Sequence, residues 1–236
     1  MPSLGDTRFL VLDVETTGLN PQEDRIVQIA LVSVHCGRVA QLGAMLVNPE
    51  RPIPPRASAI HHITNRQVEQ APTWAAVWPN VERLLLEVDV IVAHNAVFDR
   101  SFLPSVNKPW LCTKRLAQRL WPSAPNFKNQ TLRYWLDLAL DATAHDAAGD
   151  ALVTAHVLMR EIEAYQAKGS EDNPAALIQW TDSPVRIEIM PFGKHFGERL
   201  ADIPVSYIRW ALANVTDLDP DLRWSLESVL QQAASA

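Results

Sequence analysis

The chain has 236 residues and a formal net charge of −6, a length that allows one large domain or a medium domain with a small appendage. A composition that is 47% hydrophobic and 20% charged excludes a disordered or coiled-coil chain. No apolar stretch reaches the roughly 18 residues of a membrane span, so we expect no membrane partner. Because the first residues lack the basic region of a secretory signal and two cysteines make no disulfide framework, we expect a cytoplasmic protein.

The first part of the chain predicts strands. Residues 8–14 and 26–34 are short apolar runs rich in β-branched residues, and residues 39–48 continue as a third strand. Strands that follow each other so closely suggest an antiparallel meander. A proline-rich stretch then breaks regular structure and leaves a loop that carries the sequence IHHIT at 60–64.

Strands and helices alternate after this loop. A further buried strand is predicted at 88–93. The predicted helices cover 74–87, 97–104, 113–121, 131–138 and 147–166. Strands first and alternating units later predict an α/β fold, with a mixed β-sheet flanked by helices.

A composition change marks the end of this domain. Residues 167–184 mix Gly, Ser, Asn, Pro and charge, and we expect a linker there between a domain at 1–166 and a small unit at 185–236. This α-rich appendage opens with a strand-like segment at 185–190. Two helices follow, the second with Asp219 as N-cap and Pro220 at the first helical position.

Positive charge is concentrated in one segment. Residues 100–135 contain no acid and carry a charge of +7, which leaves −13 for the rest of the chain. A basic segment in an acidic protein suits a phosphate-containing partner, although a solvated helical face explains it as well.

Two carboxylates stand at the end of the first predicted strand. Asp13 and Glu15 lie two residues apart, so both point to the same side of the strand, beside an apolar run. Repulsion between them is costly unless a cation or a proton intervenes.

Three more residues extend this set. Asp99 follows the strand at 88–93, and His145 and Asp150 stand at the beginning of the longest helix. Taken singly, Asp99 reads as a helix-start acid and His145 as a surface histidine. Taken together, four carboxylates suit hard divalent ions, and one imidazole beside them suits a general base.

These residues stand in three motifs that resemble the DEDDh group of 3′→5′ exonucleases, within the ribonuclease H-like superfamily. The motifs are LDVETTG at 12–18, HNAVFD at 94–99 and HDAAGD at 145–150, and the resemblance covers residues 8–166. IHHIT resembles the family's V-H-G-I-T, from which Ile60 and His62 depart. Two further segments, CTKRLAQRLWP at 112–122 and FGKHFGERLADIP at 192–204, are similar to exonuclease X-like proteins.

The resemblance implies a ribonuclease H-like fold and two-metal phosphodiester hydrolysis with Mg²⁺ or Mn²⁺. Asp13 would bridge the two ions, Glu15 and Asp150 would complete one site, and Asp99 would hold the other. His145 would deprotonate the attacking water, and the product would be a 5′-mononucleotide.

The resemblance also implies substrate contacts. The backbone at Thr16 and Thr17 would meet the terminal 3′ hydroxyl of the strand. The side chains expected against the last bases are His61, Ile63 and Phe98, although core packing explains Ile63 and Phe98 as well. The cations expected along the phosphate path are Arg100, Lys114, Arg115 and Arg119.

Three functions remain open at this point. The favoured one is a metal-dependent exonuclease acting on single-stranded DNA 3′ ends. The alternatives are an exoribonuclease acting on RNA 3′ ends or short oligoribonucleotides, and a polymerase-associated or DNA-docking subunit. Residues 185–236 are expected to contact a protein partner or nucleic acid.

Overall fold

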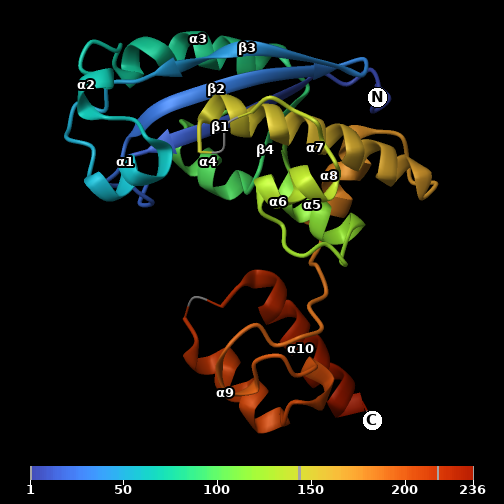
Figure 1. Ribbon diagram of the computed structural model, residues 1–236. Helices are drawn as coiled ribbons and strands as arrows, with labels where there is room; N and C mark the ends of the chain where they lie inside the picture. The colour runs from blue at the N-terminus through green and yellow to red at the C-terminus, as the bar shows by residue number, and fades with distance from the viewer. Residues whose placement is uncertain (1, 143–144, 217, 236) are drawn as a thin grey trace. The chain divides into compact units, whose positions relative to one another are not determined.

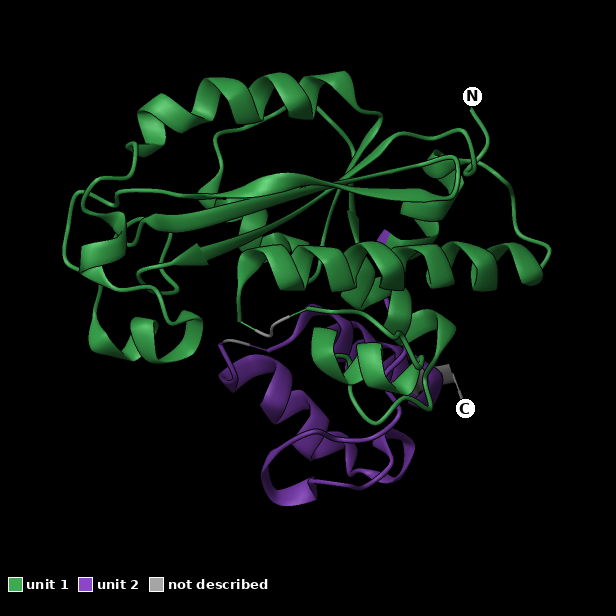
Figure 2. Ribbon diagram, turned by 45° about the horizontal axis from the view of Figure 1, so that its top comes forward, with its two compact units in different colours: residues 1–181 green, residues 182–236 purple. Residues whose placement is uncertain are grey.

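The computed structural model describes residues 2–142, 145–216 and 218–235. The chain forms two compact units, Met1–Thr181 and Asp182–Ala236, which are coloured separately in Figure 2. No helix in these described ranges has both the length and the apolar content needed to cross a membrane.

A five-stranded mixed sheet forms the centre of the first unit (Figure 1). Its strands are β1 (Phe9–Thr16), β2 (Ile26–His35), β3 (Arg38–Leu46), β4 (Val90–Ala93) and β5 (Trp110–Cys112). They lie in the order β3-β2-β1-β4-β5. β1, β2 and β3 form the predicted antiparallel meander, while β4 runs parallel to β1 and β5 runs parallel to β4. The predicted mixed α/β fold is therefore confirmed, although the short strand β5 was not expected.

Eight helices of the described chain belong to this unit or end it. They are α1 (Pro55–His61), α2 (Asn65–Val68), α3 (Trp74–Glu87), α4 (Ala96–Phe102), α5 (Thr113–Leu120), α6 (Asn129–Trp135), α7 (Ala147–Ala167) and α8 (Pro174–Asp182). The five predicted helices correspond to α3, α4, α5, α6 and α7 within a few residues. The two short helices α1 and α2 occupy the region expected to be a loop, because Pro55 stands at a first-turn position that tolerates proline.

The alternation of β1 divides the core into two layers. Phe9 and Val11 pack on the side of α7, whereas Leu10 and Leu12 pack on the side of α3. Figure 1 shows these two helices on opposite faces of the sheet. The α7 surface against the sheet is a stripe of small buried residues, Ala147, Ala151 and Ala155. A helix with alanines at this spacing approaches a sheet closely, which brings its first turn near the end of β1.

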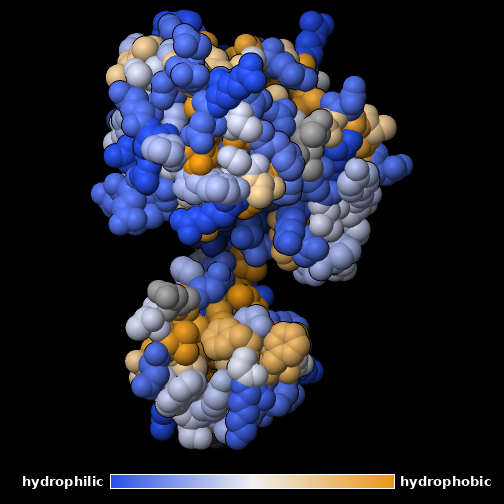
Figure 3. Space-filling view, turned by 60° about the vertical axis from the view of Figure 1, so that its left-hand side comes forward, coloured by the Kyte–Doolittle hydropathy of each residue, from blue (hydrophilic) through white to orange (hydrophobic). Residues whose placement is uncertain are grey.

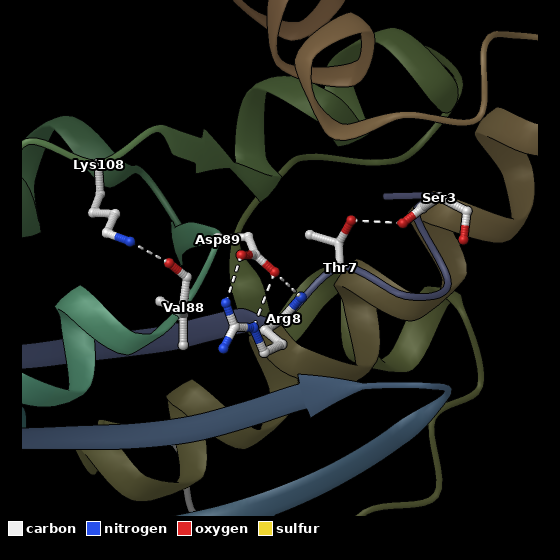
Figure 4. A network of polar contacts seen from close by, with 6 residues as sticks. All are labelled: Ser3, Thr7, Arg8, Val88, Asp89 and Lys108. Atoms are coloured by element: carbon white, nitrogen blue, oxygen red, sulfur yellow. Dashed lines mark hydrogen bonds and ion pairs between the residues drawn. The ribbon is translucent and has the colours of Figure 1, made fainter. Parts of the chain in front are cut away.

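Polar contacts fix the opposite end of β1 (Figure 4). The Arg8 guanidinium donates to both carboxylate oxygens of Asp89, at 3.2 and 2.8 Å, and the Arg8 backbone N–H donates to the same group at 2.9 Å. These bonds join the starts of β1 and β4 and lower the pKa of Asp89. Lys108, from the basic segment, donates to the Val88 carbonyl at 2.6 Å.

Residues in the expected linker pack into the first unit. Leu177 of α8 is fully buried in the core beneath α7, and the ring of Trp180 lies 5.3 Å from that of Tyr165. The two compact units therefore divide between residues 181 and 182, towards the end of the expected linker at 167–184.

The second unit has its own small core. It contains two 3₁₀ turns (Gly193–His195 and Leu200–Asp202) and the helices α9 (Val205–Asn214) and α10 (Pro220–Ser235). Met190, Ile208, Leu222 and Leu226 are buried at its centre. The segment predicted as a strand at 185–190 forms only an isolated bridge, between Ile189 and Arg199.

Candidate active site

Three carboxylates converge at the end of β1. Asp13 and Glu15 continue the face of β1 that α7 covers, and Asp150 lies in the first turn of α7. One oxygen from each of these three residues lies within 4.8 Å of the other two. The structure therefore brings together three of the four carboxylates that the sequence singled out.

The start of α7 is fixed to the sheet. Asp146 is the N-cap, and its side chain accepts a hydrogen bond from the Gly149 backbone at 3.4 Å. Gln28 of β2 donates to Asp146 at 3.1 Å and accepts from the Ala147 backbone at 3.2 Å. These two hydrogen bonds tie β2 to the N-terminus of α7 and so fix the position of Asp150.

Asp99 lies in α4, directly after β4, and is 2% exposed. Its Oδ1 accepts a hydrogen bond from the Val14 backbone N–H at 3.2 Å, so α4 is tied to β1 between the two strand carboxylates. Asp99 is outside the group of three, although its charge acts on Asp13.

The pKa values of these acids report uncompensated negative charge. Burial, together with repulsion from Asp99, Glu15 and Asp150, raises the pKa of Asp13 well above its usual range. Burial and repulsion from Asp150 and Asp146 raise the pKa of Glu15 to about 7, and burial raises that of Asp99 to about 7. A divalent cation held by oxygen ligands would remove this repulsion, so the residues present fit a metal site.

His145 lies beside this group. It is exposed, its φ is 58°, and its backbone N–H donates to Asp150 Oδ2 at 2.9 Å. A left-handed conformation at a non-glycine residue is costly and persists where the surroundings enforce it. The bond to Asp150 is one such constraint, and because the backbone makes it, it does not engage the imidazole.

Two amide side chains that sequence reasoning missed support Asp150. Gln130 Nε2 donates to Asp150 Oδ1 at 2.7 Å, and Asn129 Nδ2 donates to the Asp150 backbone carbonyl at 2.9 Å. Both residues begin α6, after the loop rich in proline and asparagine. Their only signal in the sequence is this position at a helix start.

A cavity of about 580 Å³ opens on one side of the carboxylates, and we call it the Phe98 cavity. Of the predicted substrate-binding residues, Thr16, Thr17, His61 and Phe98 line it, together with Glu15 and Arg56. The Thr17 hydroxyl donates to Asp24 at 2.9 Å and accepts from the Arg25 backbone at 3.0 Å, and the Thr17 backbone N–H donates to the Arg25 carbonyl at 2.8 Å.

His61 and Ile63 have different places in this wall. His61 is 5% exposed, and its Nδ1 accepts from the Ile63 backbone N–H at 3.0 Å. Burial lowers the pKa of His61, so the ring is neutral near pH 7. Ile63 packs with Val27 and Ile53 in a small core cluster and does not line the cavity. The Ile63 side chain therefore lies in the core, which is the alternative that the sequence left open.

A second cavity, of about 570 Å³, opens on the other side and is here called the Lys114 cavity. It is lined by Asp13, Asp150, His145, Lys114, Lys128 and Gln130 among others. His94 forms part of its wall and bonds to Thr113 Oγ1 at 2.8 Å and to the Phe127 carbonyl at 2.9 Å. Burial lowers the pKa of His94 to about 4, so this ring is a neutral tether for the loop before α6.

The other predicted cations point elsewhere. Arg100 lies over the ring of Trp110 at 5.9 Å, and Arg119 lies over the ring of Trp180 at 5.3 Å. Arg115 donates to the Thr181 carbonyl at 3.3 Å. Lys114 alone of the four predicted phosphate contacts lines a cavity beside the carboxylates, where it is joined by Lys128.

This arrangement is suited to one kind of chemistry. Carboxylates that hold divalent ions, an adjacent imidazole and a cavity with lysines can bind a phosphodiester and activate water against it. The neighbouring cavity without lysines can hold the group on the other side of the bond that breaks.

Comparisons with known proteins agree with this chemistry. Residues 10–158 match the family model described as "Exonuclease". Residues 184–214 match a second family model, which is named for a quorum-sensing-regulated virulence factor. The chain is 34% identical over 228 residues to "Exodeoxyribonuclease 10" of Escherichia coli (strain K12), which covers 94% of this chain and 98% of that protein.

A shorter match is to a polymerase-related protein. The "DNA polymerase III subunit epsilon-like protein" of Rhodobacter capsulatus is 37% identical over 173 residues, covering 68% of this chain and 24% of that protein.

Solved structures match the fold of the first unit. "Exonuclease X in complex with 5' overhanging duplex DNA" has a TM-score of 0.63 and 33% identity, covering 73% of this chain and 99% of that chain. "Exonuclease I (apo)" has a TM-score of 0.56 and 18% identity, covering 74% of this chain and 44% of that chain, and shows a shared fold.

Proposed function

The chain belongs to the exonuclease family and is a metal-dependent nuclease, and from that premise we propose that it removes 5′-mononucleotides from the 3′ ends of DNA, with single-stranded ends favoured. The observation that carries this proposal is the convergence of Asp13, Glu15 and Asp150, with Asp99 and His145 beside them. These are the residue types and positions that phosphodiester hydrolysis needs.

The metal ligands are Asp13, Glu15, Asp150 and Asp99, and the ions are two Mg²⁺ or Mn²⁺. Hard oxygen ligands select such ions, and the raised pKa values of the acids indicate a site that gains from bound positive charge. When bound, the ions polarise the phosphodiester and neutralise the charge on the leaving 3′ oxygen.

His145 accepts the proton of the attacking water. The bond from its backbone to Asp150 holds it at the carboxylates, while its exposed ring remains open to solvent, which carries the proton away. His145→Ala should lower the rate about 10²–10⁴-fold with little change in stability, because the side chain is exposed. An unchanged rate would remove His145 as the base.

The Phe98 cavity holds the terminal nucleotide. The backbone of Thr16 and Thr17 meets the 3′ hydroxyl, and Phe98 and neutral His61 pack on the base. Stacking on a ring tolerates every base, which suits digestion without sequence preference. Ile63 acts beneath this surface, since its backbone orients the His61 ring.

Lys114 and Lys128 contact the phosphates on the 5′ side of the bond to be broken. Arg115 and Arg119 contribute through the fold, because they join α5 to α8, and Arg100 lies on α4 against Trp110.

DNA is favoured over RNA because a relative that matches nearly the whole chain is named an exodeoxyribonuclease, and a similar solved structure holds DNA. An exoribonuclease remains the alternative that the test must exclude.

Product analysis tests the proposal. Oligomers of DNA and RNA with one sequence and a 5′ label, and a DNA duplex with a recessed 3′ end, are digested with Mg²⁺, with Mn²⁺ or with chelator. We expect a ladder of shortened single-stranded DNA with either ion and no ladder with chelator. Faster digestion of RNA would replace the proposed substrate, and internal cleavage would contradict an exonuclease.

A further inference from the structure

Exposed apolar side chains are concentrated on the second unit. Of the twelve large hydrophobic side chains exposed in the described part of the chain, five lie in this unit, which holds less than a quarter of the residues. Figure 3 shows apolar surface gathered on the smaller body. Phe196 is 73% exposed and Trp210 is 51% exposed, which is unusual for large aromatic residues. Such a patch marks an interaction site.

The aromatic side chains of this patch are organised. The ring of Tyr207 lies 4.4 Å from that of His195, edge to face, and 5.4 Å from that of Trp210. Phe196 follows His195 in the chain. We call these four residues the aromatic platform.

Backbone geometry holds the platform in shape. The turn that carries His195 and Phe196 lies between Gly193 and Gly197, with φ values of 73° and 83°. A Cβ at Gly193 would lie 2.7 Å from the Tyr207 hydroxyl, so this turn packs directly against α9. Glu198 accepts from the His195 ring at 2.9 Å, and the Gly197 backbone donates to Met190 at 2.9 Å.

Positive charge accompanies the rings. Lys194 precedes the turn residues of the platform, and Arg209 adjoins Trp210 on the solvent face of α9. Arg199 lies just after the turn. All three are exposed, and none forms an ion pair with a carboxylate in the ranges that the structure describes.

We propose that the aromatic platform binds single-stranded nucleic acid, with bases stacked on Phe196 and Trp210 and phosphates at Lys194 and Arg209. Exposed rings beside unpaired cations are the combination that binds single strands without sequence preference. The identity of this occupant rests on the proposed function, since a strand bound here is tethered to a nuclease by one chain. Lys194 and Arg209 supply local positive charge next to these rings in the chain, in a unit that holds eight acids and five lysines or arginines.

Binding without turnover tests the proposal. The affinity of the full chain for a fluorescent single-stranded DNA of about 20 nucleotides, long enough to reach beyond one site, is measured by anisotropy in chelator. Phe196→Ala with Trp210→Ala should weaken binding about tenfold or more. The matched control is Trp224→Ala, which removes an exposed tryptophan of α10 outside the platform and should leave the affinity unchanged.

Charge variants keep the test decisive if the double variant unfolds. Lys194→Glu with Arg209→Glu changes only exposed residues and should lower the slope of log affinity against log salt by about 2. An affinity and a salt slope equal to those of the unchanged chain would overturn the proposal. A platform variant that loses self-association but binds DNA normally would also overturn it, in favour of an interface between copies.

The two proposals fail separately. Binding that depends on the platform, with no hydrolysis of DNA after metal is added, would reject the proposed function and retain the platform. Hydrolysis of DNA in which the platform variants bind as tightly as the unchanged chain would reject the platform and retain the proposed function.

Discussion

The two cavities beside the carboxylates differ in charge although they meet at one strand end. Glu15 borders the Phe98 cavity, while Asp13, two residues earlier, borders the Lys114 cavity. The first has aromatic and acidic walls with Arg56 as a cation, and the second has two lysines and several amides. Under the proposed function, this difference would separate recognition of a base and sugar from recognition of phosphates, with the reacting bond between them.

Asp13→Asn should break the site on both sides at once. The amide keeps the shape but loses the charge that holds metal, so turnover should fall at least about 10⁴-fold. Removing one of the repelling charges should also raise the melting temperature of the metal-free chain near pH 8. Asp141→Asn, at an exposed position outside both cavities, is the control. A melting temperature that falls would mean that the variant acts through misfolding.

Gln130→Met should weaken metal binding only at Asp150, which borders the Lys114 cavity. The bond to Asp150 is lost, so the apparent affinity for Mg²⁺ should fall about 10–100-fold, with rates recovering at high metal concentration. The metal dependence of the initial rate measures this. Gln118→Met on α5, outside both cavities, should leave it unchanged. An equal shift in both variants would remove Gln130 as a support of the metal site.

Lys128→Glu and Phe98→Ala should separate the two cavities by their response to salt. Each should raise KM by about tenfold, the first because a phosphate contact is lost and the second because stacking is lost. Only Lys128→Glu should reduce the slope of log KM against log salt, by at least about 1. Matching slopes in the two variants would contradict the assignment of phosphates to the Lys114 cavity.

The smallest expected effect is on stability. Glu15 and Asp99, each with a pKa of about 7, hold protons in the folded metal-free chain that the unfolded chain releases. Their stabilisation is therefore present below the ordinary carboxyl range and lost as the pH rises through about 7. His94 has a pKa of about 4 in the folded chain, so it lowers the stability as the pH falls below its ordinary value of 6.5 and has no effect above it.

Thermal unfolding in chelator between pH 6.5 and about 8.5 isolates the carboxyl effect. The melting temperature should fall across this window, by about 2–4 °C for each kcal/mol lost, and Mg²⁺ should reduce the fall. A melting temperature that rises would show that neutralisation of these acids does not govern stability.

The structure brings together Asp13, Glu15 and Asp150 of the predicted set, and each of these acids stands where local structure determines its direction. Asp13 and Glu15 share one face of β1, and Asp150 lies in the first turn of a helix whose small residues face the sheet. Local pattern therefore indicated the direction of each side chain, and the resemblance of the three motifs indicated that they form one group. The contact of Gln130 with Asp150 could not be predicted in this way, because it depends on how His94 holds the loop before α6.

The cations show the opposite case. Lys114 and Arg119 both lie on α5, but the partner of Arg119 is Trp180, about sixty residues later in the chain. Helical spacing cannot reveal which face of α5 a distant helix covers. The basic segment thus consists mainly of structural contacts, and Lys128 was not distinguished from its neighbours by sequence alone.

The alanine stripe of α7 affects the size of the ion that the carboxylates can hold. Ala147, Ala151 and Ala155 set the distance between helix and sheet, and that distance sets the gap between Asp150 and the strand acids. Mg²⁺ binds oxygens at about 2.0–2.1 Å, whereas Ca²⁺ takes about 2.3–2.6 Å. A single added methyl group at Ala151, far from any reacting atom, would widen the gap and tune the site towards larger ions. Under the proposed function, the choice of metal would then depend on a row of side chains that carry no chemistry of their own.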